Sequence, residues 1–345
     1  MLNKIVVMMM LCVISFTVYA QSGDSPVDHM SFFTTREGEL SKKYLSYMSE
    51  AAHGNRARKI EKKRQEIVLE IKQSLAEVNR LRPYKGDASL RNAYKNYWDI
   101  LLKVFNEDYG KIVNMEEIAE QSYDKMEAYL LAQEKAGEVL EVAHDSVEVK
   151  YESFAARNNV TLIHTDTKMS KKMRQVGRVN HYYHELYLIF FKSYKQEAYV
   201  MDAINRKDIN SVEQNNSTLI RFAEEGITRL DTVKAFNGDG SLINNCKKVL
   251  AFHKLEAEKY IPVMSDYLLK ADEFEKIKKA YDAKPSSKRT QTDIDAYNKA
   301  VNQMNEAVNK SNSASQALYA GNQKVLDGWN QAVKNFMEHY VPKGK

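Results

Sequence analysis

The stretch HYYHE places two histidines and a glutamate, His181, His184 and Glu185, within one helical turn of each other. Side chains three or four residues apart lie on one face of a helix, and imidazole and carboxylate groups are ligands of zinc and related metals. The pattern therefore raises a metal-dependent enzyme as one hypothesis. No further cluster of histidine or cysteine accompanies it, so a hydrogen-bonded layer between helices is the other interpretation, and we expect no cofactor.

A basic cluster is the second feature that could do chemistry. Six of the nine residues in RARKIEKKR are basic, namely Arg56, Arg58, Lys59, Lys62, Lys63 and Arg64. Such a cluster favours an acidic partner, either an envelope protein or an acidic surface polymer, whereas the other interpretation is a solvated helix face. The whole chain carries 51 basic and 46 acidic residues, and this near balance argues against nucleic-acid binding.

Polar residues also interrupt an apolar pattern near the C-terminus. Apolar residues recur at seven-residue intervals from Ile294 to Phe336 and from Tyr297 to Ala332, and this spacing predicts a long coiled-coil helix. Three polar residues fall within the two sets: Ser311, Ser315 and Asn322. These polar residues could fix the register in which this helix packs against its neighbours. Alternatively, they could line a polar cavity that binds a small ligand.

An aromatic segment, HYYHELYLIFFKSY, is the last candidate. Tyr183 and Tyr187 share one apolar stripe of this segment, and a helix that is apolar on more than one face lies at the centre of a bundle. A ligand groove or a subunit interface is the alternative. Cys246 is a lone thiol, and the chain has no glycine-rich phosphate loop or paired cysteine motif, so we expect no catalytic activity.

The composition predicts an all-α fold around these residues. Only five prolines and 13 glycines occur among 345 residues, and no proline lies between Pro83 and Pro262. Long stretches without the two helix-breaking residues favour long helices.

A repeated turn divides the chain. YKGDASL at Tyr84–Leu90 and FNGDGSL at Phe236–Leu242 share the order aromatic, Gly-Asp, Ser-Leu at a shift of 152 residues. At the same shift, six apolar positions before the first turn fall on six before the second, with helical spacing. Gly110 falls on Pro262, and both residues weaken a helix.

The repeat predicts two tandem duplicated helical-bundle units with long kinked helices, at residues 21–165 and 166–345. Each unit has a first helix, a break at HGN (53–55) or NRK (205–207), a second helix, the turn and a long kinked arm. The glycine of the turn is expected to end the second helix in a left-handed conformation. NMEE at 114–117 predicts a capping box.

The first twenty residues have the pattern of an export signal. One lysine, Lys4, precedes an apolar run to about Phe16, and Ala20 is a suitable residue for cleavage before Gln21. The run is too short to cross a bilayer about 30 Å thick, and no later stretch is apolar enough to cross one. We therefore expect an exported protein, in the periplasm or on the outer surface of a Gram-negative-type bacterium.

Three segments carry a resemblance to a known family: HGNRARKIEKKRQEI, PYKGD and NEDYGKIVNMEEIAEQSYDKMEAYLLAQEK. The resemblance is most specific over about residues 40–160 and looser beyond. They resemble an uncharacterised leptospiral-type family of predicted helical bacterial surface proteins. The resemblance implies an exported, all-helical envelope protein without a known activity, and it carries over no site residues.

The sequence thus favours an exported, non-catalytic envelope protein that binds a partner through its helix faces. Two alternatives stay open. One is a helical carrier or sensor of a small ligand in a bundle cavity, and the other is a metal-dependent enzyme at His181 and His184. The sequence does not set the oligomeric state.

Overall fold

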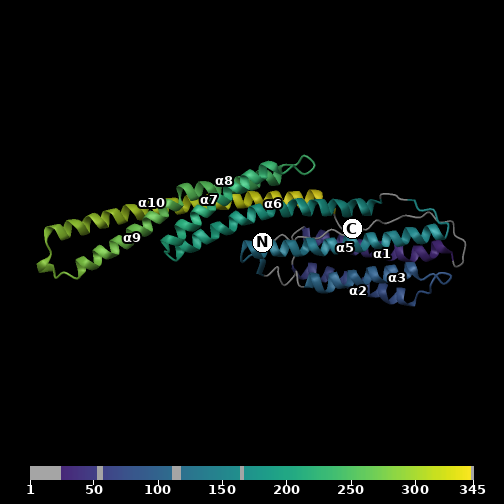
Figure 1. Cartoon of the computed structure of the whole chain (residues 1–345). Coiled ribbons are helices and arrows are strands. Elements are labelled where there is room, and N and C mark those ends of the chain that lie inside the picture. Colours follow the sequence, from purple (N-terminus) through teal and green to yellow (C-terminus); the bar gives the residue numbers. More distant parts are fainter. Residues whose placement is uncertain (1–24, 53–56, 111–117, 164–166, 343–345) are drawn as a thin grey trace. The chain divides into compact units, whose positions relative to one another are not determined.

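The computed structural model describes residues 25–52, 57–110, 118–163 and 167–342, and the regular structure in these ranges is helical (Figure 1). The predicted all-α fold is therefore confirmed. The helices in chain order are α1 (Pro26–Ala52), α2 (Ala57–Arg80), α3 (Ser89–Lys103), the π-helix η1 (Val104–Asp108), α5 (Tyr123–Arg157), α6 (Lys168–Asn205), α7 (Ile209–Thr232), α8 (Ser241–Lys259), α9 (Ile261–Asp282), the 3₁₀-helix η2 (Ser286–Lys288) and α10 (Gln291–Tyr340).

The chain forms two compact units. The first runs to Glu185 and includes the C-terminal residues from Lys334, and the second comprises Leu186–Val333. Residues of α6 and α10 therefore belong to both units. Because this division follows packing, the unit boundary expected from the repeated turn, between residues 165 and 166, stays a prediction.

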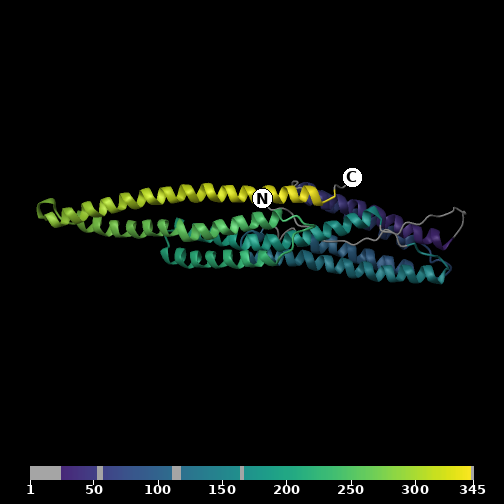
Figure 2. The same cartoon turned by 90° about the horizontal axis from the view of Figure 1, so that it is seen from above.

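In the first unit, α1 packs against α2, α2 against α3, and α3 against α5 (Figures 1 and 2). Aromatic side chains fill the interior between them. Phe33 of α1 stacks on Tyr94 of α3 with 4.3 Å between ring centroids, and Trp98 lies 5.5 Å from Tyr94. Such ring pairs stabilise a core beyond the area that they bury, so tyrosine is a core residue here.

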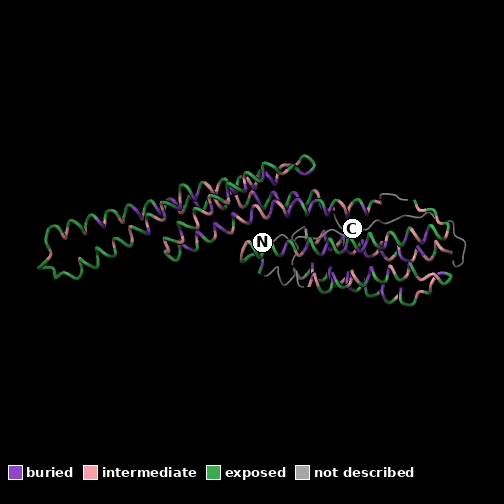
Figure 3. Tube along the Cα trace, viewed as in Figure 1, coloured by how far each residue is buried: buried purple, intermediate pink, exposed green. Residues whose placement is uncertain are grey.

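In the second unit, α7 packs against α8 and α9, and α8 packs against α9. Nine buried residues form one apolar cluster of this unit: Val200, Ala203, Val212, Leu219, Ala257, Ile261, Met264, Leu268 and Leu318. Toward the loop that joins them, α9 and α10 run as a largely exposed pair (Figure 3). Tyr281 stacks on Tyr297 there, with 4.4 Å between ring centroids.

The two Gly-Asp turns have the same backbone geometry. Lys85 and Gly86 have φ of 47° and 88°, and Asn237 and Gly238 have φ of 50° and 86°. Two successive positive φ values define a tight turn of the kind that glycine favours. The expectation that each glycine ends a helix is wrong, because α2 and α7 both end six residues earlier.

The aspartate after each glycine holds the start of the next helix. Asp87 Oδ1 accepts a hydrogen bond from Ser89 N, and Asp239 Oδ1 accepts one from Ser241 N, both at 2.8 Å. In the first unit, Arg157 of α5 also donates to Asp87 Oδ2 at 3.0 Å. The bonds from Ser89 and then from Arg157 lower the pKa of Asp87 to about 2.

The structure shows an irregularity shortly before Gly110, whereas the residues directly after Gly110 lie outside the described part, so the kink expected there stays a prediction. Gly110 has helical backbone, and the departure from α-helical bonding is the π-helix η1. Within η1, the carbonyl oxygen of Phe105 accepts a hydrogen bond from Nη1 of the buried Arg64 of α2. A change from α to π bonding leaves a backbone group to be satisfied in another way, and Arg64 does so here.

In the second unit a break does occur at the predicted place. One residue separates α8 from α9, and Pro262 lies in the first turn of α9, where its missing N–H costs no helical hydrogen bond. The NRK break is confirmed: α6 ends at Asn205 and α7 begins at Ile209. The HGN break and the predicted capping box at NMEE fall outside the described residues.

Helix α10 is continuous over 50 residues, as the heptad pattern predicts. In the first half of α10 a buried line lies beside the two predicted sets, at Ala300, Ala307 and Ala314, whereas four members of the predicted sets are buried further along: Leu318, Trp329, Ala332 and Phe336. The same spacing leads to Gly321, where an added Cβ would lie 2.2 Å from the ring of Phe252 in α8. Small residues therefore allow the close approach of α8 to α10.

Candidate functional sites in the two units

A layer of polar side chains crosses the apolar interior of the second unit. It contains Glu197 of α6, Glu256 of α8 and Asn322 of α10. Asn322 Nδ2 donates to Glu197 Oε1 at 3.2 Å, whereas neither carboxyl oxygen of Glu256 has a hydrogen-bond partner among the described residues. Glu256 is completely buried, so neither water nor a donor stabilises its charged form.

The two carboxyl groups of this layer influence each other. Burial, together with the nearby Glu197 carboxyl, raises the pKa of Glu256 to about 9. Burial also raises the pKa of Glu197 to about 7. Two neighbouring carboxyls in an apolar interior do not both ionise without a compensating positive charge. The layer therefore has the electrostatics of a site for a proton or another cation.

A histidine extends the polar layer along α8. His253 lies three residues before Glu256 and is also completely buried. Its Nδ1 lies 2.7 Å from Ser193 Oγ of α6, while its Nε2 has no hydrogen-bond partner in the described part of the chain. Burial lowers the pKa of His253 to about 3. The imidazole is therefore neutral at physiological pH, and Nε2 is an acceptor in the tautomer in which Nδ1–H donates to Ser193 Oγ and a donor in the other.

Helical spacing explains why these groups are buried. The inner face of α8 includes Leu242, Cys246 and Leu250, followed at the same spacing by His253 and Ala257. Glu256 adjoins this stripe and is equally inaccessible. The signal was present in the sequence as HKLE, which places two polar residues where the stripe requires apolar ones.

The first unit contains a polar cavity of another kind. It has room for about one water molecule, and its lining comes from α1, α3 and α5: Thr34, Glu37, Tyr94, His144, Val147, Glu148 and Tyr151. The Tyr94 hydroxyl donates to Glu37 Oε2 at 3.2 Å. Burial raises the pKa of Glu37 to about 8, so this carboxyl is largely protonated at neutral pH.

The structure does not bring His181, His184 and Glu185 together as a metal site. His181 is exposed, His184 is buried and Glu185 is half-buried, because adjacent positions on α6 face different surroundings. Burial, with a smaller effect of His181, lowers the pKa of His184 to about 3. Within the described ranges, the ligand atoms that converge belong instead to His144, Asp145 and Glu148 of α5, which the sequence analysis did not identify.

The six basic residues of RARKIEKKR do not form one exposed patch. Arg64 is buried, and it donates from Nη2 to Glu61 Oε1 at 2.7 Å as well as to the Phe105 carbonyl. Lys59 pairs with Glu50 at 2.7 Å and Lys63 with Glu66 at 2.8 Å, whereas Lys62 is exposed. Arg56 and the side chain of Arg58 lie outside the described part. A binding role for the remaining cluster stays a prediction.

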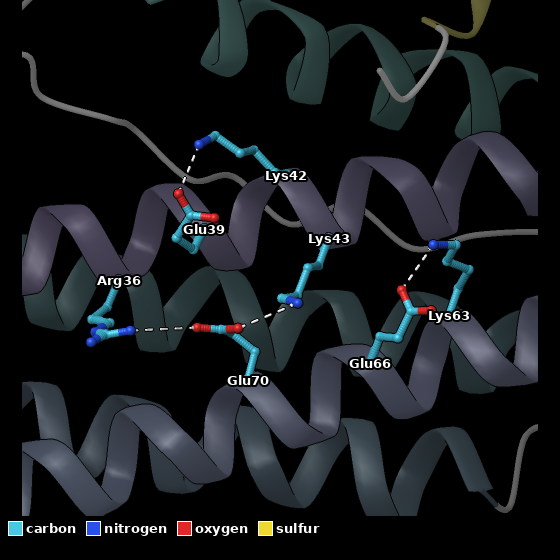
Figure 4. Close-up of polar contacts among 7 residues, drawn as sticks. All are labelled: Arg36, Glu39, Lys42, Lys43, Lys63, Glu66 and Glu70. Carbon is cyan, nitrogen blue, oxygen red and sulfur yellow. Dashed lines mark hydrogen bonds and ion pairs between the residues drawn. The ribbon is translucent and has the colours of Figure 1, made fainter.

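Acidic residues also neutralise positive charge between α1 and α2. Figure 4 shows Glu70 of α2 between Arg36 and Lys43 of α1, at nitrogen–oxygen distances of 3.9 and 3.4 Å, with the Lys63–Glu66 pair one turn away. Glu70 is 7% exposed, so this pairing is better shielded from solvent than a surface ion pair. These charged side chains therefore stabilise the packing of α1 against α2.

The structure does not bring the residues predicted to line a ligand cavity on α10 into one site. Asn322 belongs to the polar layer, whereas Ser311 is buried about 16 Å away along the helix. Ser315 is half-buried. Tyr183 and Tyr187 are both buried, and the ring of Tyr187 lies 5.8 Å from that of Phe191, as expected for core aromatics.

The fold and these sites define an all-α helical-bundle protein with titratable groups buried in each unit. No family model matches the chain, and no curated protein or solved structure shows significant similarity to it. No helix in the described ranges is long and apolar enough to cross a membrane.

Proposed function

We propose that this chain is an exported, non-catalytic helical binding protein whose second unit senses a small cation. The observation that carries the proposal is Glu256, a completely buried carboxyl group that has no hydrogen-bond partner in the described structure. Such a group lowers stability unless something binds it. Glu197 is close enough to raise the pKa of Glu256, Asn322 is hydrogen-bonded to Glu197, and His253 lies three residues before Glu256 on α8.

A cation at this layer would couple binding to packing. It would displace the proton of Glu256 and bridge the carboxyls of α8 and α6, while Asn322 links Glu197 to α10. Three helices would then respond to one binding event. The small residues of α10, which allow the close approach of α8, make this packing sensitive to small displacements.

The test is thermal unfolding of the purified protein with K⁺, Ca²⁺ or the diamine putrescine as probes. We expect at least one probe to raise the unfolding midpoint of the wild type and to release protons into a weakly buffered solution. Glu256→Gln should abolish both effects. Glu258→Gln, which changes an exposed glutamate two residues further along α8, is the matched control and should respond as the wild type does.

Two outcomes would count against this function. The proposal is wrong if none of the three probes shifts the midpoint of the wild type. It is equally wrong if Glu256→Gln and the wild type respond alike, since binding would then occur elsewhere.

Binding of a partner protein through a helix face is the second candidate, and α5 provides the observation for it. Leu131, Val142 and Val149 are 52%, 69% and 57% exposed, and intervals of 11 and seven residues place them on one side of the helix. Exposed apolar groups that gather on one face mark interaction surfaces. A photo-crosslinker at Leu131 should capture a partner in native cells, and Val142→Lys should abolish capture while Glu141→Lys preserves it.

Duplication and export also belong to the proposal. In support of duplication, α2 and α7 end 152 residues apart, α3 and α8 begin 152 residues apart, and the two turns have matching φ values. Export is supported by the pattern of residues 1–20, which lie outside the described part. The periplasm or the outer surface is the proposed location.

A further inference from the structure

Three potential metal ligands lie together on α5 of the first unit. His144, Asp145 and Glu148 each offer one ligand atom, and these atoms lie within 4.8 Å of one another. His144 and Glu148 are four residues apart and share a helix face, with Asp145 beside them. One imidazole nitrogen and two carboxylate oxygens form a donor set that zinc and neighbouring divalent metals accept. Acidic groups also gather without a metal, so the cluster alone does not define a site.

The cavity of the first unit supplies the independent observation. Glu37 of α1 lines the same cavity as His144 and Glu148, and it is only 4% exposed. Its Oε2 accepts the hydrogen bond from Tyr94, but its Oε1 has no partner among the residues that the structure describes. A buried carboxyl oxygen without a donor, beside a cavity lined by an imidazole and a second carboxyl, is a place for a cation or for water bound to one.

The geometry points to a divalent metal site in the first unit, with His144, Asp145 and Glu148 as ligands and Glu37 as the inner carboxylate. Zinc–ligand distances of about 2.0–2.2 Å set ligand atoms about 3.4 Å apart in a tetrahedral site. The ligand atoms, at separations of up to 4.8 Å, reach that spacing by side-chain rotation. Asp145 is exposed and Glu148 half-exposed, so these rotations require no movement of the backbone.

The donor set also selects among metals. Ca²⁺ and Mg²⁺ take oxygen ligands, whereas a histidine nitrogen beside carboxylates favours zinc or a first-row transition metal. Because Glu37 is on α1 and the three ligands are on α5, the ion would join two helices of the first unit. This site is separate from the cation-sensing layer proposed for the second unit, and neither requires the other.

The experiment is a titration of the chelator-treated, purified protein with Zn²⁺ in competition with a chromophoric chelator. We expect one equivalent to bind, and we expect His144→Gln and Glu148→Gln each to weaken binding by about tenfold or more. Glu37→Gln should weaken Zn²⁺ binding less, since Glu37 is the inner carboxylate and is not one of the three ligands on α5. Glu141→Gln, an exposed residue three positions before His144, is the control and should bind as the wild type does.

A second readout separates ligation from a general effect on folding. Co²⁺ in place of Zn²⁺ should give a visible absorption spectrum in the wild type that His144→Gln changes, and circular dichroism verifies that each variant is folded. If His144→Gln does not fold, Asp145→Asn decides, because it alters an exposed side chain. The proposal is overturned if the wild type binds no equivalent of Zn²⁺, or if the folded ligand variants bind it as tightly as the wild type.

Discussion

The two units share features of their scaffold but differ in which core positions are polar. At a shift of 152 residues, three buried polar residues of the second unit correspond to apolar residues of the first. The pairs are Leu45 and Glu197, Leu101 and His253, and Val104 and Glu256, and all six residues are buried. The first unit in turn buries Glu37 at the position where the second has Ile189.

This comparison separates what packing requires from what it does not. Burial is the same in both units at the three pairs Leu45–Glu197, Leu101–His253 and Val104–Glu256, so the helical scaffold sets it there, whereas Ile189 is only half-buried. Polarity differs, and an apolar residue at such a position is the more stable choice because it avoids the desolvation of a carboxyl group. Stability therefore does not explain why the second unit has polar residues at these buried positions, and the proposed cation layer supplies an explanation.

The largest predicted effect comes from making the first unit resemble the second. Val104→Glu places a carboxyl group in an apolar environment without a partner, and we expect it to lower the free energy of unfolding by about 4 kcal/mol at pH 7. The chain has two tryptophans, so Trp329→Phe leaves Trp98 to report on the first unit during urea denaturation. Lys103→Glu, at an exposed neighbouring position, should change stability by less than about 0.5 kcal/mol. Equal effects of the two variants would contradict the comparison.

The pH dependence of the second unit is the next largest effect. The folded-state pKa values of Glu197 and Glu256, about 7 and about 9, exceed the ordinary 4.5. The folded unit therefore holds protons that the unfolded chain releases, so the stabilisation is complete below pH 4.5 and is lost as the pH rises toward 9. With Trp98→Phe leaving Trp329 as the reporter, we expect a loss of about 3 kcal/mol between pH 7 and pH 9.

The first unit should respond less over the same range. Among its described residues, the carboxyl with a comparably raised pKa is Glu37, at about 8, so the decline reported by Trp98 should be smaller and Glu37→Gln should flatten it. Glu256→Gln should flatten the curve of the second unit. On the acid side, the lowered pKa of His253 has the opposite sign: its stabilisation is present above pH 6.5 and is lost as the pH falls toward 3. Equal slopes in the two units would refute the assignment.

The sequence predicted the helical fold, the continuous terminal helix and the two turns, because these features depend on local spacing and on glycine. Arg64 could also have been placed correctly. It is four residues after Ile60 and three before Ile67, which puts it on the buried face of α2. A count of the charges in RARKIEKKR does not show which face of the helix each one occupies. Arg64 was therefore grouped with the surface residues.

The polar layer was harder to predict because its members meet only through tertiary packing. Asn322 was recognisable as a polar interruption of the heptads, but its partner Glu197 lies 125 residues earlier. His253 and Glu256 had a local signal in HKLE, yet nothing local indicates that Glu256 lies near Glu197. The same holds for Glu37 of α1, whose cavity is completed by residues of α3 and α5.

A smaller effect should follow from making the second unit resemble the first. Glu256→Met removes the unpartnered carboxyl while keeping a side chain of similar length, and we expect it to stabilise the second unit by about 2 kcal/mol at pH 9. The gain should shrink at pH 5, where the wild-type carboxyl is protonated. Urea denaturation followed by Trp329 measures both values. A loss of stability at pH 9 would mean that Glu256 has a partner that stabilises its charge.

The smallest predicted effect concerns what the two units share. Gly86 and Gly238 have φ of 88° and 86°, and an added Cβ at either would meet no atom within 4 Å. Alanine in this left-handed conformation costs about 1–2 kcal/mol, so Gly86→Ala and Gly238→Ala should each destabilise their own unit by about 1 kcal/mol, and equally. Gly38→Ala, in the middle of α1 with open space around it, should instead be neutral or stabilising.

Any inequality between the two glycine variants would have a structural source that can be tested. The first turn is tied to α5 by the bond from Arg157 to Asp87, a contact that depends on the geometry around Gly86. If Gly86→Ala costs more than Gly238→Ala, Arg157→Ala should remove the difference in a double-mutant cycle. If the difference persists in that cycle, the backbones of the two turns are not energetically equivalent, and their matching dihedral angles would not indicate a shared scaffold.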